Sequence, residues 1–330
     1  MALLKRLRDL RSETNTGFGT NSNSTGGRFI NKDGNPNVIK RGVGLLDRYS
    51  WYHTMLGMKR SKFLFLLFVI YISLNMVFAG IYYLVGTEHL TIPVTSSPWK
   101  KFSEVFFFSA QTFTTVGYGR IAPVGFIASA VSTFEAFLGL LSFAIATGLF
   151  YGRFSKPTAY LKFSDNALIA PYKDITALMI RVAPYKNTTL TDAEAKVTLG
   201  MTIEENGKMV NKFYPLELEY DRVNALTLNW TIVHPITENS PFYNFSPEDY
   251  SNLNGEIIVF IKAFDDMFSN TVVDRSSYTL KEVVVGAKFV PMYHRNSAGK
   301  KTVLNLEKLN AFTEADISFA FANHSNAASS

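Results

Sequence analysis

Two long apolar stretches constrain most strongly what this chain can fold into. Residues 63–85 and 124–151 are almost wholly apolar, and each exceeds or matches the roughly 20 helical residues that cross a lipid bilayer. Within a bilayer every backbone polar group has to be satisfied by the protein, which leaves helices and closed barrels as spanning structures. We therefore predict a membrane-spanning helix over each of these two ranges.

A short segment between the two stretches interrupts this pattern. Residues 102–113 are rich in phenylalanine but too few to cross the bilayer, and they lead into the run Thr-Thr-Val-Gly-Tyr-Gly at 114–119. Non-helical backbone at membrane depth is tolerated only where protein covers it or where it lines an aqueous cavity. The order of segments predicts a re-entrant pore helix over 102–113, followed by an extended run at a central axis.

The run 114–119 has the composition of a potassium selectivity filter. Rings of backbone carbonyls from four chains can replace the hydration shell of a potassium ion. Glycine adopts unusual backbone angles at little cost, so Gly117 and Gly119 can help to aim successive carbonyls at the axis. We predict that K⁺ is bound by the Thr115 hydroxyl and by the carbonyls of Thr115, Val116, Gly117, Tyr118 and Gly119.

Charge is distributed unevenly along the chain. Residues 1–62 hold 12 Lys or Arg against 4 Asp or Glu, a local +8 within a total of +6, so the remainder sums to −2. A basic segment beside a spanning helix marks the cytoplasmic side. Because two spans return the chain to its starting side, both termini are expected in the cytoplasm.

The chain divides into five segments. Residues 1–44 contain many Asn, Thr, Gly and Ser and are predicted to be largely disordered. Residues 45–60 mix aromatic and polar side chains, which favours an interfacial slide helix over the alternative of a plain linker. The pore domain spans 61–156. Short runs of β-branched and aromatic residues over 157–300 are typical of a β-sandwich, and 301–330 is predicted to be a tail.

Several function classes are disfavoured by the same sequence. The chain has no cysteine, so it can form neither disulfides nor thiolate metal sites. Its β-rich half lacks the Gly-rich turn that a nucleotide-binding domain needs, and no catalytic constellation is evident. We expect no enzyme, no cofactor and no nucleic-acid partner.

The chain resembles the inward-rectifier potassium channels, and within them the prokaryotic branch. Besides the run 114–119, the resemblance rests on these blocks in order: 106–109, Glu135 with Gly139, 146–149, 153–157, 230–236, 238–241, and 275–278 followed by Gly286. It implies a fold of the membrane α plus all-β class, with a two-helix pore domain, a re-entrant pore helix and an immunoglobulin-like cytoplasmic β-sandwich. It also implies a homotetramer, formed with three further copies of the chain, in a bacterial inner membrane.

The resemblance further implies passive potassium conduction, gated by anionic phospholipids such as phosphoinositide, with inhibition expected in the bacterial branch. The matching lipid-binding positions are Arg60, Lys62, Arg153 and Lys156, for which plain positive-inside anchoring is the alternative. Tyr151 matches the gate of the inner helices, with interfacial anchoring as the alternative, and Phe268 and Asn270 match a second constriction.

Four positions carry particular expectations. Phe143 replaces the cavity acid of strongly rectifying relatives, so strong block by Mg²⁺ or polyamines is not expected. Gln111 replaces a pore-helix Glu, so the brace of the filter toward Arg120 should be weaker or built differently. Arg120 should also place four positive charges near the outer mouth and lower the local potassium concentration. Glu135 is expected behind the filter, with a cavity-facing position as the alternative.

Two other functions stay open from the sequence. The changes at Gln111 and Arg120 could loosen the filter and give a poorly selective cation channel on the same scaffold. Alternatively, the chain could be a membrane ligand sensor in which the β domain matters more than the pore.

Overall fold

The structure is a computed structural model, and it describes residues 6–7, 10–13, 16–19, 27–42, 44, 50–92, 97–205, 207–297 and 299–317. The chain forms two compact units. One comprises Arg41–Lys156, and the other joins Met1–Lys40 to Pro157–Ser330.

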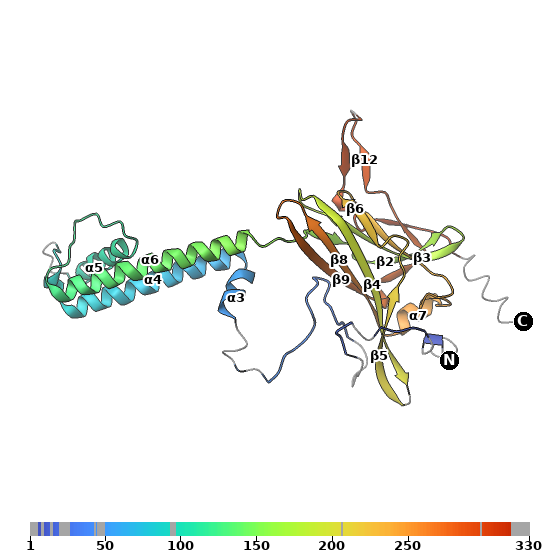
Figure 1. Cartoon of the computed structure of the whole chain (residues 1–330), viewed down its shortest axis with the longest axis horizontal. Coiled ribbons are helices and arrows are strands. Elements are labelled where there is room, and N and C mark those ends of the chain that lie inside the picture. The colour runs from blue at the N-terminus through green and yellow to red at the C-terminus, as the bar shows by residue number, and fades with distance from the viewer. Residues whose placement is uncertain are drawn as a thin grey trace, which may run out of the picture. The chain divides into compact units, whose positions relative to one another are not determined.

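The unit Arg41–Lys156 is helical. Among the described residues, two helices are long and apolar enough to cross a membrane, α4 (Arg60–Val85) and α6 (Phe126–Phe154), and they run side by side in Figure 1. In each helix, only 17% of the most apolar 18-residue stretch is buried within the single chain. Such large apolar surfaces have to be covered by lipid or by other chains.

Two shorter helices complete this unit. α5 (Pro98–Phe113) starts with proline in its first turn, where the missing amide hydrogen costs nothing. It agrees with the pore helix predicted over 102–113 but begins earlier. α3 (Trp51–Gly57) is capped by the Ser50 side chain, which accepts a hydrogen bond from the His53 amide. It lies inside the predicted slide helix 45–60, of which residues 45–49 fall outside the described part.

The second unit is a β-sandwich of two five-stranded sheets. Figure 1 labels several of its strands, among them β2, β3, β4, β8 and β9. The first has the order β1-β3-β2-β10, with β7 beside β3: β1 (Leu161–Phe163), β2 (Ala167–Tyr172), β3 (Ile175–Pro184), β7 (Trp230–Pro235) and β10 (Val283–Val285). The second has the order β5-β4-β8-β9, with β6 beside β4: β4 (Leu190–Glu205), β5 (Lys208–Leu216), β6 (Arg222–Leu226), β8 (Gly255–Asp265) and β9 (Asn270–Thr279).

Both sheets bury one face in a shared apolar core. Leu178 and Ile180 of the first sheet and Leu199, Ile257 and Val259 of the second belong to one buried cluster. Burial alternates along much of β4, as expected when one face of a strand points into the core. The all-β character of this unit therefore agrees with the sequence pattern over 157–300.

Small elements near the C-terminus extend the sandwich. They are η2 (Leu280–Glu282), β11 (Ala287–Phe289), β12 (Tyr293–Arg295), β13 (Thr302–Leu304), η3 (Leu306–Lys308) and β14 (Phe312–Glu314). The short helix α7 (Pro247–Asn252) precedes them in the same unit, and η1 (Thr87–His89) belongs to the helical unit. β14 pairs with β11, and Leu309 and Ile317 are buried. The prediction of a tail from residue 301 was therefore wrong for 301–317, because these residues fold with the sandwich.

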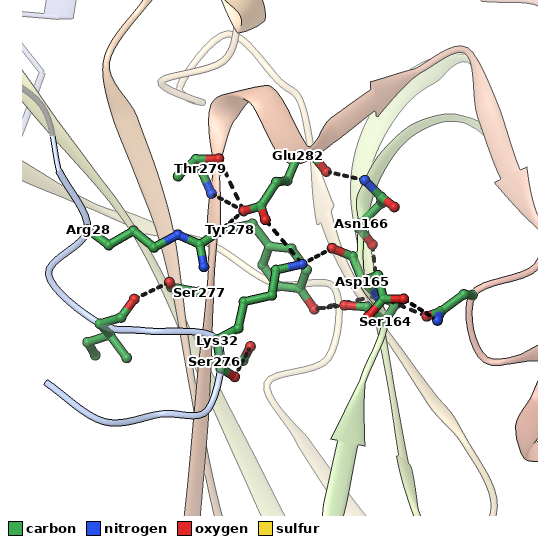
Figure 2. A network of polar contacts seen from close by, with 12 residues as sticks. Arg28, Lys32, Ser164, Asp165, Asn166, Ser276, Ser277, Tyr278, Thr279 and Glu282 are labelled. Atoms are coloured by element: carbon green, nitrogen blue, oxygen red, sulfur yellow. Dashed lines mark hydrogen bonds and ion pairs between the residues drawn. The ribbon is translucent and has the colours of Figure 1, made fainter. Parts of the chain in front are cut away.

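Residues 28–32 also differ from the prediction of a largely disordered N-terminus. Arg28 and Lys32 both pair with Glu282, Lys32 at 3.3 Å between Nζ and Oε1 (Figure 2). The Ser276 hydroxyl donates to the Lys32 carbonyl at 3.1 Å. The prediction was wrong for these residues, since side chains of the β domain satisfy backbone groups that the segment's own composition leaves free.

A buried carboxylate completes this attachment. Glu256 on β8 accepts hydrogen bonds from the amides of Phe29 and Ile30, the latter at 3.1 Å. Burial raises its pKa, against the lowering effect of those amides. Further upstream, Leu7 is fully buried in the sandwich core, and its carbonyl accepts a bond of 2.7 Å from the Tyr214 hydroxyl. Leu7 and residues 28–32 are thus anchored to the β domain.

Candidate ion-binding site

The run after α5 has an alternating backbone conformation. Thr115, Gly117 and Gly119 have φ of 59°, 53° and 78°, whereas Val116 and Tyr118 between them are not left-handed. Alternation of this kind turns successive carbonyls toward the same side, unlike a β-strand, in which they alternate. A left-handed threonine is uncommon and strained, so its presence here indicates a function that requires this geometry.

The inner part of the run is tied to the end of α5. The amides of Val116 and Gly117 donate to the Gln111 carbonyl at 2.9 Å and 3.3 Å, and the Thr115 amide donates to Thr112 at 3.0 Å. Gln111 therefore supports the run through its main chain. The expectation from the sequence concerned only the side chain of Gln111.

Several aromatic side chains predicted to face a pore are exposed in the single chain. Tyr151 on α6 is 74% exposed and Phe143 is 73% exposed. Phe143 also shares the lining of a cavity of about 780 Å³ with Thr115. Phe143 therefore lies on the same hollow as the inner end of the run, and its place in a central pore stays a prediction.

Glu135 lies in a polar network that joins three helices. It is fully buried on α6 and accepts a hydrogen bond of 2.6 Å from the Tyr82 hydroxyl of α4 and another from Ser109 of α5. The Ser109 oxygen also lies 3.2 Å from the amide oxygen of Asn75 on α4. The carboxylate therefore points at the pore helix, and the cavity-facing alternative does not describe this arrangement.

Gly139 is a second contact between α6 and the pore helix. A Cβ at this position would lie 1.9 Å from the carbonyl oxygen of Phe113, the last residue of α5. No side chain fits there, so the two backbones pack directly against each other. The sequence offered Gly139 only as part of a family block, because its partner is far away along the chain.

The outer end of the run is held differently from expectation. Arg120 forms an ion pair with Glu104 of α5. The expected brace would instead have joined Arg120 to the side chain of residue 111. The carboxylate compensates the positive charge that Arg120 carries. The prediction that Arg120 lowers the potassium concentration at the outer mouth took no account of Glu104, which gives the guanidinium an anionic partner.

Arg153, at the end of α6, contacts the C-terminal end of α3. Its guanidinium donates to the carbonyl of Met58 at 2.6 Å and to that of Leu56 at 3.4 Å, and it lies 4.5 Å from the centroid of the Phe63 ring. Carbonyls at a helix C-terminus lack partners within the helix, and a cation satisfies them. Arg153 thus links α3 to α6.

The other predicted lipid-binding residues are more accessible. Arg60, Lys62 and Lys156 are all exposed. The Arg60 guanidinium lies 5.9 Å from the centroid of the Phe154 ring, which places it beside the end of α6. Arg60 and Lys62 begin one spanning helix and Lys156 follows the other.

The predicted second constriction is the turn between β8 and β9. The buried Asp265 accepts hydrogen bonds from the amides of Met267 at 2.9 Å and Phe268 at 3.3 Å. Ser269 has a left-handed φ of 47°. Asn270 is exposed and Phe268 is partly so, which leaves both accessible at the tip of the turn. Sequence reasoning missed Asp265, which holds this turn from inside.

A buried histidine stabilises the block 230–241. His234 lies 2.6 Å from the Glu217 carbonyl through Nδ1 and 2.8 Å from the Ser240 hydroxyl through Nε2. Burial lowers its pKa, although the Glu217 carbonyl acts in the opposite direction. The neutral ring, donating from Nδ1 and accepting at Nε2, satisfies both neighbours.

Comparison with known proteins gives matches to both units. The family model described as the inward rectifier potassium channel C-terminal domain matches residues 161–329, and the model described as ion channel matches 68–156. The inward rectifier potassium channel Kirbac3.1 of Paramagnetospirillum magnetotacticum is 30% identical over 280 residues, which cover 84% of this chain and 92% of that protein.

Two solved structures were also compared. The sporulation control protein Spo0M of Bacillus subtilis has a TM-score of 0.23 and 11% identity, covering 39% of this chain and 50% of its own. The DNA glycosylase AlkC of Pseudomonas fluorescens, bound to DNA containing an abasic site analogue, has a TM-score of 0.18 and 10% identity, covering 57% and 48%. Scores this low support no argument about fold or function.

Proposed function

The chain belongs to the inward rectifier potassium channel family, and from that premise we propose that it conducts potassium passively and selectively through a pore lined by Thr115, Val116, Gly117, Tyr118 and Gly119. One observation carries the proposal. The left-handed φ at Thr115, Gly117 and Gly119 aims successive carbonyls at one side, where they can replace the water around a potassium ion. The Thr115 hydroxyl adds a further ring of oxygens.

The pore requires four copies of the chain. Carbonyls from one chain cover only one side of an ion, whereas four such runs around an axis enclose it. The exposed apolar surfaces of α4 and α6 support this assembly, because lipid and neighbouring chains would cover them. Self-association agrees with the family, and a homotetramer is the form that we propose.

Ion flux into liposomes tests this function. Purified protein should admit radioactive rubidium, a potassium analogue, much faster than radioactive sodium. Gly117→Ala should abolish the rubidium flux, because alanine is disfavoured at the left-handed φ of this residue. Gly80→Ala, a helical glycine with no heavy atom within 4 Å of the added methyl group, is the matched control and should conduct normally. Equal rubidium and sodium fluxes through the unmodified protein would contradict potassium selectivity.

The poorly selective cation channel is a second candidate. It is favoured by Gln111, whose neutral side chain cannot form the ion pair that a glutamate would form at this position. The same flux experiment separates the two functions, since a loosened filter would pass both ions.

An ion-channel family indicates a protein that is not an enzyme.

Anionic phospholipid is the regulator that we propose. Arg60, Lys62 and Lys156 are exposed basic residues at the ends of the spanning helices, and each such cation attracts an anionic surface by about 1 kcal/mol. Arg153 contributes by holding the slide helix beside them. Phosphoinositide should inhibit rubidium flux, and the pair Lys62→Gln and Lys156→Gln should weaken inhibition. Lys100→Gln is the control, because Lys100 is a lysine in the first turn of α5, away from the helix ends that carry Arg60, Lys62 and Lys156.

Two constrictions would close the pore. Tyr151 presents an exposed aromatic ring near the end of α6, and a ring of such side chains can stop ions by excluding water. Phe268 and Asn270 would form the second, at the tip of the β8–β9 turn. The two spanning helices indicate a membrane protein, and we propose a bacterial inner membrane with both termini in the cytoplasm.

A further inference from the structure

The run 115–119 is held unevenly along its length. Its first three amides, those of Thr115, Val116 and Gly117, donate hydrogen bonds to Thr112 or Gln111 near the end of α5. Neither Tyr118 nor Gly119 makes a hydrogen bond to α5, all of whose residues the structure describes. The outer half of the run therefore needs a different attachment.

The ion pair between Arg120 and Glu104 supplies that attachment. Arg120 directly follows Gly119, and Glu104 precedes Gln111 by seven residues along α5. Seven helical residues span about 10 Å. The chain thus turns back along the pore helix and is fastened at two levels, at the Gln111 carbonyl and at the Glu104 carboxylate.

The next residue strengthens the outer attachment. Ile121 is buried and shares an apolar cluster with Val105, the neighbour of Glu104 on α5. An apolar contact fixes where the chain lies but is not directional, whereas a charge-assisted hydrogen bond also fixes its orientation. Arg120 and Ile121 together therefore fix both the place and the direction of the chain leaving Gly119.

We propose that Glu104 and Arg120 are positioning residues that set the geometry of the outer filter and thereby its selectivity. This inference rests on the proposed channel function. The pair is half-exposed, with side-chain exposures of 56% for Arg120 and 25% for Glu104. Pairs this exposed contribute little to stability, so their loss should alter ion selection and leave the assembly intact.

A charge-swap experiment tests this proposal. Rubidium and sodium fluxes would be measured in liposomes for Arg120→Gln, Glu104→Gln, Arg120→Lys and the double variant Arg120→Glu with Glu104→Arg. Each neutral variant should lower the rubidium-to-sodium ratio by at least about twofold, the lower range of coupling between contacting residues. The double variant should restore the ratio, and Arg120→Lys should lower it less than Arg120→Gln because the charge is kept.

Conductance at low and high salt distinguishes a brace from a simple electrostatic field. If the charges only set the local ion concentration, Arg120→Gln and Glu104→Gln would change conductance in opposite directions, and salt would screen both effects. A brace predicts that both variants lose selectivity in the same direction at every salt concentration. Lys100→Gln, an exposed lysine in the first turn of α5, removes a positive charge without touching the pair and should keep full selectivity.

The outcomes separate this inference from the proposed function. If the unmodified protein passes sodium as readily as rubidium, the channel assignment itself is contradicted. If the unmodified protein is selective and both neutral variants match it, the positioning role is overturned and the channel assignment stands. Size-exclusion chromatography would show whether each variant keeps its assembly, and Arg120→Lys provides a readout should a neutral variant dissociate.

Discussion

Replacing Gly139 by alanine should damage ion selection more than the size of one methyl group suggests. The added Cβ would lie 1.9 Å from the Phe113 carbonyl oxygen, whereas real Cβ contacts essentially never fall below 3.0 Å. α6 and the end of α5 would have to separate by at least 1.1 Å, the difference between these two distances. Phe113 is followed by Thr114 and then by Thr115, the first residue of the proposed filter, so the displacement reaches that run.

A shift of this size exceeds the tolerance of a working site. Functional groups have to be held to within about 0.5 Å of their productive positions. We therefore expect Gly139→Ala to reduce the rubidium-to-sodium flux ratio severely, or to abolish rubidium flux. Flux into liposomes would be measured alongside size-exclusion chromatography, so that loss of selection is distinguished from loss of assembly.

The same helix offers a matched control. Gly148 on α6 has no heavy atom within 4 Å of an added Cβ, and alanine is favoured over glycine in a helix by about 1 kcal/mol. Gly148→Ala should therefore assemble normally and stay selective. If Gly139→Ala and Gly148→Ala showed the same selectivity as the unmodified protein, the direct packing of α6 on the pore helix would not matter for the filter.

Three further outcomes are expected. Because burial lowers the pKa of His234 below its ordinary 6.5, the unfolded chain binds a proton that the folded chain does not once the pH falls below that value. The free energy of unfolding should then drop by at most about 1.4 kcal/mol per pH unit below 6.5, and His234→Gln should remove this slope in urea titrations at about pH 7.5 and about pH 5.5. Phe143→Glu should create strong, voltage-dependent block by spermine in planar bilayers, because a carboxylate can hold a polycation whereas the apolar ring of Phe143 cannot. Unchanged block would show that residue 143 does not line the cavity. Asp265→Ala should lower the free energy of unfolding by about 1–3 kcal/mol through two lost amide partners, and Asp265→Asn by less; equal stability of all three would show that the carboxylate does not hold the turn.

The features that the sequence reveals are those encoded locally. Composition and length alone predict the spans near α4 and α6, and the glycine pattern at 114–119 predicts an unusual backbone. Short runs of β-branched and aromatic residues over 157–300, separated by turn residues, predict strands. Each of these signals lies within a few tens of residues, so no knowledge of tertiary contacts is needed.

The features that the sequence conceals depend on distant partners. Glu135 is conspicuous as an acid in an apolar stretch, but nothing local identifies Tyr82 as its hydrogen-bond donor, 53 residues away. Glu104 looks like a surface residue until the chain folds back and brings Arg120 to it. The segment 27–42 is rich in polar residues, with only four apolar ones, and so appears disordered. Its order comes from side chains such as Glu282, more than 200 residues further along.

Locating the permeant ion tests the central claim most directly. The protein would be assembled in detergent or lipid with thallium, a potassium analogue that scatters anomalously, and its structure determined. We predict four chains around one axis, with anomalous density on that axis at the level of the carbonyls of Thr115, Val116, Gly117 and Tyr118. An assembly without a common axis, or one without ion density beside these residues, would contradict the account.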